Sequence, residues 1–425
     1  MKRDISFLVF LLISTVGFTQ ENPVTLEYCY EQIADYPLAN KTAIQKKIIN
    51  LNRQIAQSGW YPDIQLSAST SYQSDVTSVP FAAPGTSPPT FSKDHYNISV
   101  DINQTIFEGG RIGSLKNLKT KTGKAEIAAI EGELLQIRSQ VEQVYFGILY
   151  MQKKKESVEL LIQDMKEQLS SVDSRVRNGV LLPGNALVLR AEILKAGQQL
   201  PQISHDIESG YDVLGELIGE KVSSAEELVL PDLKDFEPDQ KNEIIRPEFE
   251  AFNARIESLE SQIKITEADR FPTLAVFGKA AYGRPGLNAF DDDLQEYWLI
   301  GMKAQWNFKS WSNAGKKAEV IALQQKNVKA DEEAFNRQLN ATLKQAEQQI
   351  EMLREQIEHD EEILALRSDI VKEKENLLNQ GIITSTEYIT ELNAEHQAQL
   401  DLEQHRIQLV QANIDYLTKK GISWN

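Results

Sequence analysis

The chain has 425 residues and a formal net charge of −17, with 41% hydrophobic and 25% charged residues and a single cysteine. This composition excludes both a disordered chain and a bundle of transmembrane helices. One cysteine excludes a disulfide framework and any multi-cysteine metal site. The acidic excess argues against a nucleic-acid partner, which requires clusters of Lys and Arg. The length alone suggests about three ordinary domains.

The N-terminus has the features of a secretory signal peptide, which we assign to residues 1–20. Lys2 and Arg3 precede an apolar run from Ile5 to Phe18, and polar residues follow. A membrane anchor is the alternative, but this run is shorter than the ~20 residues that a bilayer-spanning helix needs. No later stretch approaches ~18 consecutive apolar residues, so we expect a secreted chain without a transmembrane helix.

The rest of the chain consists of two halves in which the same sequence patterns follow one another in the same order. At Pro62 and again at Pro272 a helical pattern changes to an alternating one, and Gly179 and Gly381 each interrupt a long helical pattern. These landmarks repeat at a spacing of about 200 residues, which indicates an internal repeat. We assign residues 21–220 to the first repeat, residues 221–242 to a linker and residues 243–425 to the second repeat.

Long helices dominate each half. The patterns predict a first helix over Leu26–Ser58 or Pro247–Asp269, then two strands and a helix of nearly 70 residues that spans roughly 100 Å. A last helix of about 36 residues ends near Gly219 or Gly421. Elements of this length cannot form a set of compact domains, so we expect an elongated coiled bundle.

The second long helix carries a seven-residue apolar repeat typical of helices that coil around neighbours. Its members are Leu343, Ile350, Ile357, Leu364, Val371 and Leu378. The second core position of the heptad, which completes the contact seam, becomes polar after Leu353 and is occupied by Asp360, Arg367 and Lys374. We therefore expect narrower packing there, or a seam that faces an opening.

Four segments alternate between apolar and polar residues. They are residues 62–73, 96–107, 272–283 and 298–309. The third is the weakest, because Phe277 stands among its polar positions. About a dozen alternating residues suit a tilted membrane strand. A soluble sheet packed on a helix is the alternative, but no amphipathic helix is left over to cover it.

Aromatic side chains fringe the apolar face of these strands, and we assign four of them to the membrane interface: Tyr72, Tyr96, Trp298 and Trp306. Four strands cannot close a barrel, and lipid does not tolerate open sheet edges. Strands in a membrane would therefore require a homo-oligomer, and three chains would give a barrel of twelve strands.

Several short motifs occur in a specific order. They are Thr25-Leu-Glu-Tyr-Cys29, Gly59-Trp-Tyr-Pro-Asp-Ile-Gln-Leu66, Gln104-Thr-Ile-Phe-Glu-Gly-Gly-Arg111 and Val144-Tyr-Phe146. Together with the duplicated layout, they make the mature chain resemble the TolC-type outer-membrane efflux proteins, the outer membrane factors of tripartite efflux and secretion systems. The resemblance implies a mainly α fold, in which a long α-helical barrel continues into a shared transmembrane β-barrel.

The same resemblance implies a function. Such proteins are homotrimers in outer-membrane lipid of Gram-negative bacteria, with a large periplasmic portion. They conduct substrate passively from a periplasmic adaptor (membrane fusion protein) and an inner-membrane transporter to the outside. The family does no bond-making chemistry.

The resemblance also assigns functional positions of the family to individual residues of this chain. The turns at Asn178-Gly179 and Gln380-Gly381 resemble the hairpin tips to which the adaptor docks.

The family narrows its periplasmic mouth with acidic rings, which fall here on Glu387 and on Thr390, with Glu391 beside it. The family's latch arginine falls on Ile383, so the usual polar latch is not expected. Ordinary solvated helix charge is the alternative for both glutamates. In a trimer, three copies of Glu387 near one axis would raise the pKa of the carboxyl group and attract cations.

An enzymatic function has no support in the motifs. The five histidines show no metal-ligand spacing, and nucleotide-binding or nucleophile motifs are missing from the sequence. We expect no catalysis, no cofactor and no metal. The rival function is that of a secreted periplasmic coiled-coil adaptor or scaffold without channel activity. An adaptor has one helical hairpin, whereas this chain has two, each with two strands, which favours the channel.

Overall fold

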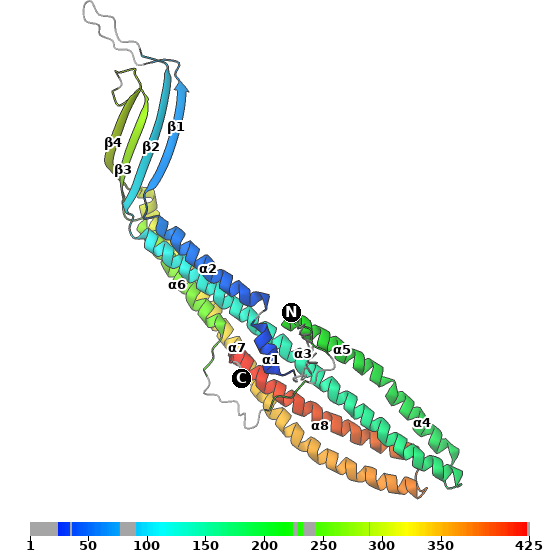
Figure 1. Ribbon diagram of the computed structural model, residues 1–425. Coiled ribbons are helices and arrows are strands. Elements are labelled where there is room, and N and C mark those ends of the chain that lie inside the picture. Colours follow the sequence, from blue (N-terminus) through cyan, green and yellow to red (C-terminus); the bar gives the residue numbers. More distant parts are fainter. Residues whose placement is uncertain are drawn as a thin grey trace, which may run out of the picture.

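A computed structural model gives an elongated molecule with a β-sheet at one end and helices that run from it to a distant tip (Figure 1). The structure describes residues 24–34, 36–76, 91–223, 228–232, 243–288 and 290–422. The predicted signal peptide and most of the predicted linker lie outside these residues.

The first half of the chain contains α1 (Leu26–Ile33), α2 (Pro37–Ser58), β1 (Asp63–Tyr72), β2 (Asp94–Phe107), α3 (Arg111–Arg177), α4 (Pro183–Gly197) and α5 (Gln199–Ile218). The second half contains α6 (Pro247–Ala268), β3 (Thr273–Arg284), β4 (Gln295–Gln305), α7 (Phe308–Asn379) and α8 (Ser385–Lys420).

The two long helices confirm the prediction from periodicity. α3 has 67 residues and α7 has 72. Each ends just before a glycine with positive φ, +75° at Gly179 and +74° at Gly381. Glycine adopts this left-handed conformation without the steric penalty of a side chain, so it ends the helix and turns the chain back.

The predicted single helix over Leu26–Ser58 is wrong, because the chain breaks between α1 and α2. Tyr36 has φ −57° and ψ 145° and directly precedes Pro37, the first residue of α2. A residue before proline is pushed out of the helical region, whereas proline itself fits the first helical turn.

The last helix of the first half is also two helices rather than one. α4 ends at Gly197 and α5 begins at Gln199, with Pro201 in the first turn of α5. Proline lacks the N–H that would continue the helical hydrogen bonds, and its ring clashes with the preceding turn. In the second half, α8 contains neither a glycine nor a proline, and it runs unbroken for 36 residues.

The four strands form one antiparallel sheet in the order β1-β2-β3-β4. The alternation placed them well, except that the segment 298–309 was wrong at its C-terminal end, since β4 ends at Gln305. There the Asn307 side chain accepts a hydrogen bond from the Ser310 N–H (3.1 Å) and starts α7.

Paired residues of neighbouring strands point to the same side of the sheet, so each row defines a face. One row of the apolar face consists of Leu66, Val100, Ala280 and Trp298. The next row, on the polar face, consists of Gln65, Asp101, Lys279 and Leu299.

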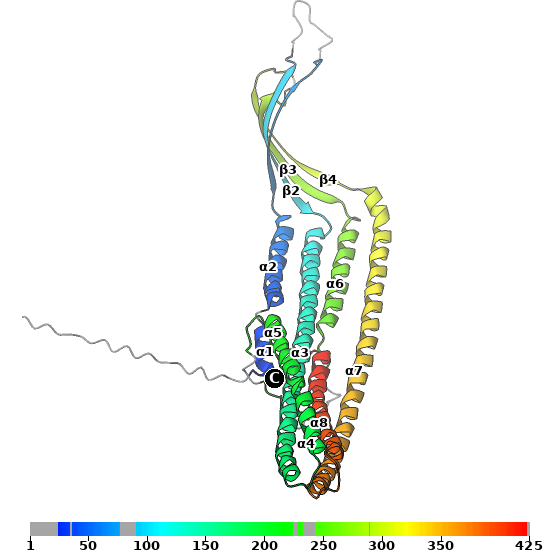
Figure 2. The ribbon, with the colours of Figure 1, turned by 90° about the vertical axis from the view of Figure 1, so that its right-hand side faces the viewer.

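Below the sheet, α2, α3, α6 and α7 lie side by side in that order, each in contact with the next (Figure 2). Nearer the tip, α4 packs on α3, and α8 packs on α3, α4 and α7. None of the helices within the described residues combines the length and the apolarity that crossing a membrane requires.

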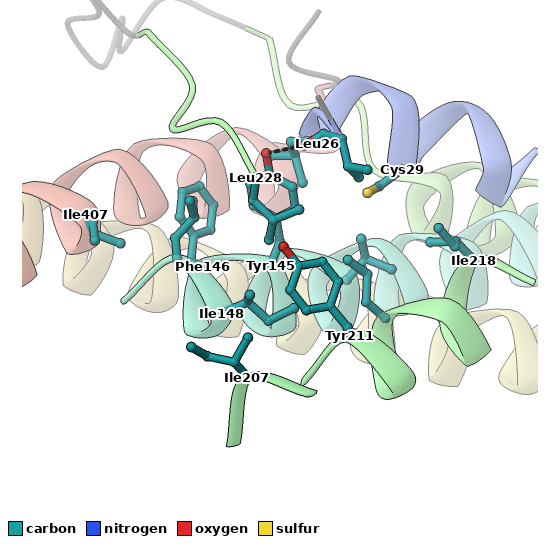
Figure 3. Packing of buried hydrophobic residues seen from close by; sticks show 14 of the residues in the cluster. Leu26, Cys29, Tyr145, Phe146, Ile148, Ile207, Tyr211, Ile218, Leu228 and Ile407 are labelled. Atoms are coloured by element: carbon teal, nitrogen blue, oxygen red, sulfur yellow. Dashed lines mark hydrogen bonds between the residues drawn. The ribbon is translucent and has the colours of Figure 1, made fainter. Parts of the chain in front are cut away.

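The largest apolar cluster lies midway along the molecule, where α1 and α5 cover α3 (Figure 3). Its centre is Tyr145, which is fully buried. The Tyr145 hydroxyl lies 2.9 Å from the carbonyl oxygen of Val24 and 2.6 Å from that of Val229, whose N–H donates to it at 3.1 Å. Val24 also forms a parallel bridge with Leu228. Tyr145 thus joins the start of the described chain to the segment between the halves.

Candidate functional site

The apolar face of the sheet is exposed in the single chain. Trp298, Ile300 and Met302 on β4 are 71%, 69% and 79% exposed, and Leu66 on β1 is 73% exposed. Monomeric soluble proteins rarely expose a contiguous apolar surface of this kind. The face therefore requires a nonpolar medium or a partner.

The four predicted interface aromatics fall at different heights of this face. Tyr72 and Tyr96 lie toward the end of the sheet away from the helices, whereas Trp306 follows β4 at the helical end. Trp298 lies in the middle row, opposite Ala280.

Further aromatic residues gather where strands and helices meet, and they were not among the residues predicted at the interface. They are Trp60, Tyr61, Phe107, Phe271, Phe308 and Trp311, all exposed. Their position beside the predicted changes from helix to strand was the signal that would have found them. With Trp306, they form a band at the helical end of the apolar face, as interface aromatics do in membrane barrels.

The margins of the molecule are open along its length. β1 and β4 are the edge strands, and α2 and α7 are the edge helices beneath them. The outer side of α2 carries an exposed apolar stripe: Ile44, Ile48, Leu51 and Ile55. On α7, Val320 and Leu323 are 55% and 53% exposed. Both margins therefore expose apolar helix surface beside an unpaired strand edge.

At the far end the two predicted hairpin tips lie together. Asn178 caps α3 and Gln380 caps α7, each followed by its left-handed glycine. The Ser385 N–H donates to Asn185 Oδ1 across the two turns at 2.8 Å.

An apolar cluster from all four helices packs behind these turns. Its buried members are Met165, Val172, Ala186, Leu189, Val371, Leu378, Tyr388, Ile389 and Leu392. The sequence-predicted tips therefore form a single surface.

Glu387 lies in the first turn of α8. Its carboxylate accepts hydrogen bonds from the Thr384 N–H (2.8 Å) and from the Thr384 hydroxyl (2.9 Å). The backbone hydrogen bond from Thr384, its hydroxyl and the nearby Lys374 hold the pKa of the Glu387 carboxyl group below its ordinary value. In the single chain this carboxylate starts the helix as part of a capping box.

Thr390 and Glu391 lie one turn further along. The Thr390 hydroxyl donates to the carbonyl oxygen of Thr386 at 2.9 Å. Glu391 forms an ion pair with Arg367 of α7 at 2.8 Å. This arginine was not predicted as part of the site, although it belongs to the polar seam found in the heptads. Asp360 of the same seam pairs with His405 of α8 at 2.5 Å.

A buried carboxyl group lies where the two halves meet. Glu142 of α3 is 3% exposed, and its Oε1 accepts hydrogen bonds from the Tyr30 hydroxyl (2.7 Å) and the Thr418 hydroxyl (2.6 Å). Burial raises the pKa of this carboxyl group against the lowering effect of the two hydroxyls. Glu142 thus connects α1, α3 and α8.

Acidic, histidine and cysteine side chains could in principle gather to bind a metal ion. In the part of the chain that the structure describes, no group of three or more His, Cys, Asp or Glu side chains is arranged to hold a metal ion. The lone Cys29 is a fully buried residue of α1, where burial raises the pKa of the thiol to about 12.

Several solved structures share this fold at low sequence identity. VceC, the outer membrane protein of Vibrio cholerae, aligns with a TM-score of 0.74 at 15% identity over 94% of this chain and 97% of its own. The Campylobacter jejuni CmeC outer membrane channel aligns at 0.69 and 14% identity over 99% and 93%. The open-state Neisseria gonorrhoeae MtrE outer membrane channel aligns at 0.70 and 15% identity over 93% and 88%.

No curated protein sequence matches the chain. The family model described as "Outer membrane efflux protein", however, matches residues 41–220 and 242–420, one match in each half. The chain therefore belongs to the outer membrane efflux protein family, and its place is the outer membrane of a Gram-negative bacterium, with its long helices in the periplasm.

Proposed function

We propose that three copies of this chain form the passive exit duct of a tripartite efflux or type I secretion system. The observation that carries this proposal is the pair of open margins. One margin consists of β1 and the apolar stripe of α2, and the opposite margin consists of β4 and α7. Each margin has an unpaired strand edge and an exposed apolar helix surface. Lipid tolerates no open edge, so the chain has to close with copies of itself.

The polar face of the sheet then lines a water-filled bore that continues between the helices. At the far end, the turns around Gly179 and Gly381 receive a periplasmic adaptor, which connects the duct to an inner-membrane transporter. In this proposal the duct is passive, and the transporter supplies the energy. The bounds of the two repeats, residues 21–220 and 243–425, follow from the same duplicated plan.

Assembly tests the proposal first. Leu51→Lys places a charge in the apolar stripe of α2, where Leu51 is 57% exposed in the single chain. We expect size-exclusion chromatography in detergent to show a trimer for the parent protein and its loss for Leu51→Lys. Asn50→Lys is the matched control, because Asn50 is exposed on a different face of α2 and should leave the trimer intact.

Conductance tests the channel directly. Purified trimer in a planar lipid bilayer should give discrete single-channel steps and should fractionate with the outer membrane. Recovery in the soluble periplasm without any conductance would contradict the channel and support the adaptor or scaffold function.

An acidic constriction at Glu387, with Thr390 and Glu391 behind it, is a further part of this proposal. Trimer assembly would bring three Glu387 carboxylates toward one axis, where they would favour cations. Glu391 is neutralised by Arg367 within the chain, so Glu387 would supply the larger share of the charge. Glu387→Gln should therefore reduce the preference for K⁺ over Cl⁻, and an unchanged preference would remove this residue from the constriction.

A further inference from the structure

The polar face of the sheet has an aromatic interruption near its helical end. Phe277 of β3 pairs with Asn103 of β2 on one side and with Gly301 of β4 on the other. The row therefore runs Asp63, Asn103, Phe277 and Gly301. Phe277 thus shares the face of polar and charged residues, opposite the face of Trp298.

The Phe277 ring leans across the sheet onto the neighbouring strand. A Cβ atom built on Gly301 would lie 2.7 Å from Cζ and 2.9 Å from Cε1 of the ring. The ring therefore occupies the space that any other residue at position 301 would fill. Leu299 stands two residues along β4 on the same face and is 45% exposed. Together they form a flat apolar patch on an otherwise polar wall.

Lysines flank this patch on both sides along the strands. Lys279 lies two residues from Phe277 and pairs with Asp101 at 3.6 Å. Lys303 lies two residues from Gly301, opposite Ala275, at roughly 7 Å along the strand. Lys303 is exposed, and no carboxylate among the described residues forms an ion pair with it. The patch therefore has an aromatic surface with a positive charge beside it.

We propose that Phe277, Leu299 and Lys303 form a contact site for aromatic anions on the inner wall of the duct. The inference rests on the proposed function, since it takes the polar face to line a water-filled bore. An aromatic ring of the passing molecule stacks on Phe277, and its carboxylate or sulfonate reaches Lys303, about one ring length away. Trimer symmetry places three such sites at one height, near the entrance from the helices.

A purely structural role is the alternative for Phe277. Aromatic side chains often cover a glycine across a strand pair and thereby stabilise the sheet. Such a role explains the contact with Gly301, but it gives no function to Lys303, which has no carboxylate partner among the described residues of the single chain. The two roles can be distinguished by current block, because only the contact role predicts that a substitution of Phe277 or Lys303 changes the block by an aromatic anion.

The test is current block in single trimers in a planar bilayer, with naphthalene-2-sulfonate as the probe. We expect the probe to reduce the current of the parent channel. Phe277→Ser should raise the half-blocking concentration about 3- to 10-fold, the range expected for one aromatic contact. Lys303→Gln should raise it about 2- to 5-fold, the range expected for one exposed charge pair. Phe277→Trp should retain block. Ala275→Ser, on the same face without a ring or charge, is the matched control and should behave like the parent.

Gly301→Ala is a second variant that leaves both contacting residues, Phe277 and Lys303, unsubstituted. Its methyl group displaces the Phe277 ring from the wall and should weaken block without abolishing conductance. The naphthyl-trimethylammonium cation should block less than the sulfonate, and the difference should vanish in Lys303→Gln.

The outcomes separate the inference from the proposed function. A protein that forms no conducting trimer contradicts the proposed function. A conducting trimer in which Phe277→Ser, Lys303→Gln and the parent are blocked equally overturns the contact site. A lowered melting temperature with unchanged block assigns Phe277 the structural role alone and also overturns it.

Discussion

The two helical hairpins follow one plan but are held together by different forces. Along α3, α4 and α5 the contact is apolar, with Val158 and Ile162 of α3 buried among Ala196 and Ile203 of the returning helices. Its ion pair, between Asp173 and Arg190, lies at the exposed surface.

The middle of the corresponding seam between α7 and α8 is charged, whereas its end away from the tip is an apolar cluster that includes Leu343, Ile350 and Tyr416. Asp360 pairs with His405, Arg367 with Glu391, and Glu361 with Arg406. Only near the tip do both hairpins share one apolar cluster. Burial stabilises the first hairpin regardless of salt, whereas ion pairs are screened by salt and depend on protonation. The stability of the second hairpin should therefore depend more strongly on salt concentration and pH than that of the first.

The largest expected effect comes from removing apolar packing at the tip. Leu189 of α4 is fully buried, and Leu189→Ala should lower the free energy of unfolding by about 2–4 kcal/mol. Thermal unfolding followed by circular dichroism in detergent measures this loss. Lys195→Ala, at the exposed end of the same helix, should change stability by less than ~0.5 kcal/mol. Equal effects of the two substitutions would show that apolar burial at the tip is not what holds α4 in place.

Glu142, where the hairpins meet, should add a pH dependence. Burial raises the pKa of this carboxyl group above the ordinary value of 4.5, so the folded chain retains its proton to higher pH than the unfolded chain. The contribution of Glu142 is then most favourable below pH 4.5 and declines as the pH rises through the raised pKa.

Glu142→Gln keeps an acceptor for Tyr30 and Thr418 but does not titrate. Its free energy of unfolding relative to that of the parent should therefore increase with pH, by about 1.4 kcal/mol for each unit by which the pKa is raised, and its melting temperature should follow. A difference between the two proteins that stays constant from pH 4 to pH 8 would contradict this.

The smallest effect is expected from the ion pair across the second hairpin. A double-mutant cycle with Arg367→Gln and Glu391→Gln should give a coupling energy of about 0.5–1 kcal/mol at low salt, because both side chains are partly exposed. The coupling should shrink toward zero at 1 M NaCl. The same cycle on Asp173 and Arg190 should give a smaller value throughout, and a larger one would reverse the comparison.

Most of the architecture was readable from periodicity. Alternation located the four strands, because a side-chain period of two matches an extended chain and no helix, and the heptads of α7 located its long helix. The breaks at Pro37 and Pro201 were also present in the sequence. They follow from the backbone chemistry of proline, which the spacing of apolar side chains does not report.

The side-chain contacts between elements could not be predicted from the sequence. The polar seam residues Asp360 and Arg367 indicated weak apolar packing, but their partners depend on the rotation of α8 about its axis. Phe277 was visible as an exception to the alternation. Its contact with Gly301 follows only from the strand register, which links residues of β3 and β4 that no local pattern connects.

The hydroxyl of Tyr145 closes two very long loops, one of 121 residues to Val24 and one of 84 residues to Val229. Loop closure of this length delays folding, because its entropy cost comes before the contacts that reward it. During synthesis, the bond to Val229 has to wait until that residue and everything before it has been made. The bridge between Val24 and Leu228 has to wait equally long. The beginning of the chain therefore cannot complete its native contacts before the whole first half has been made.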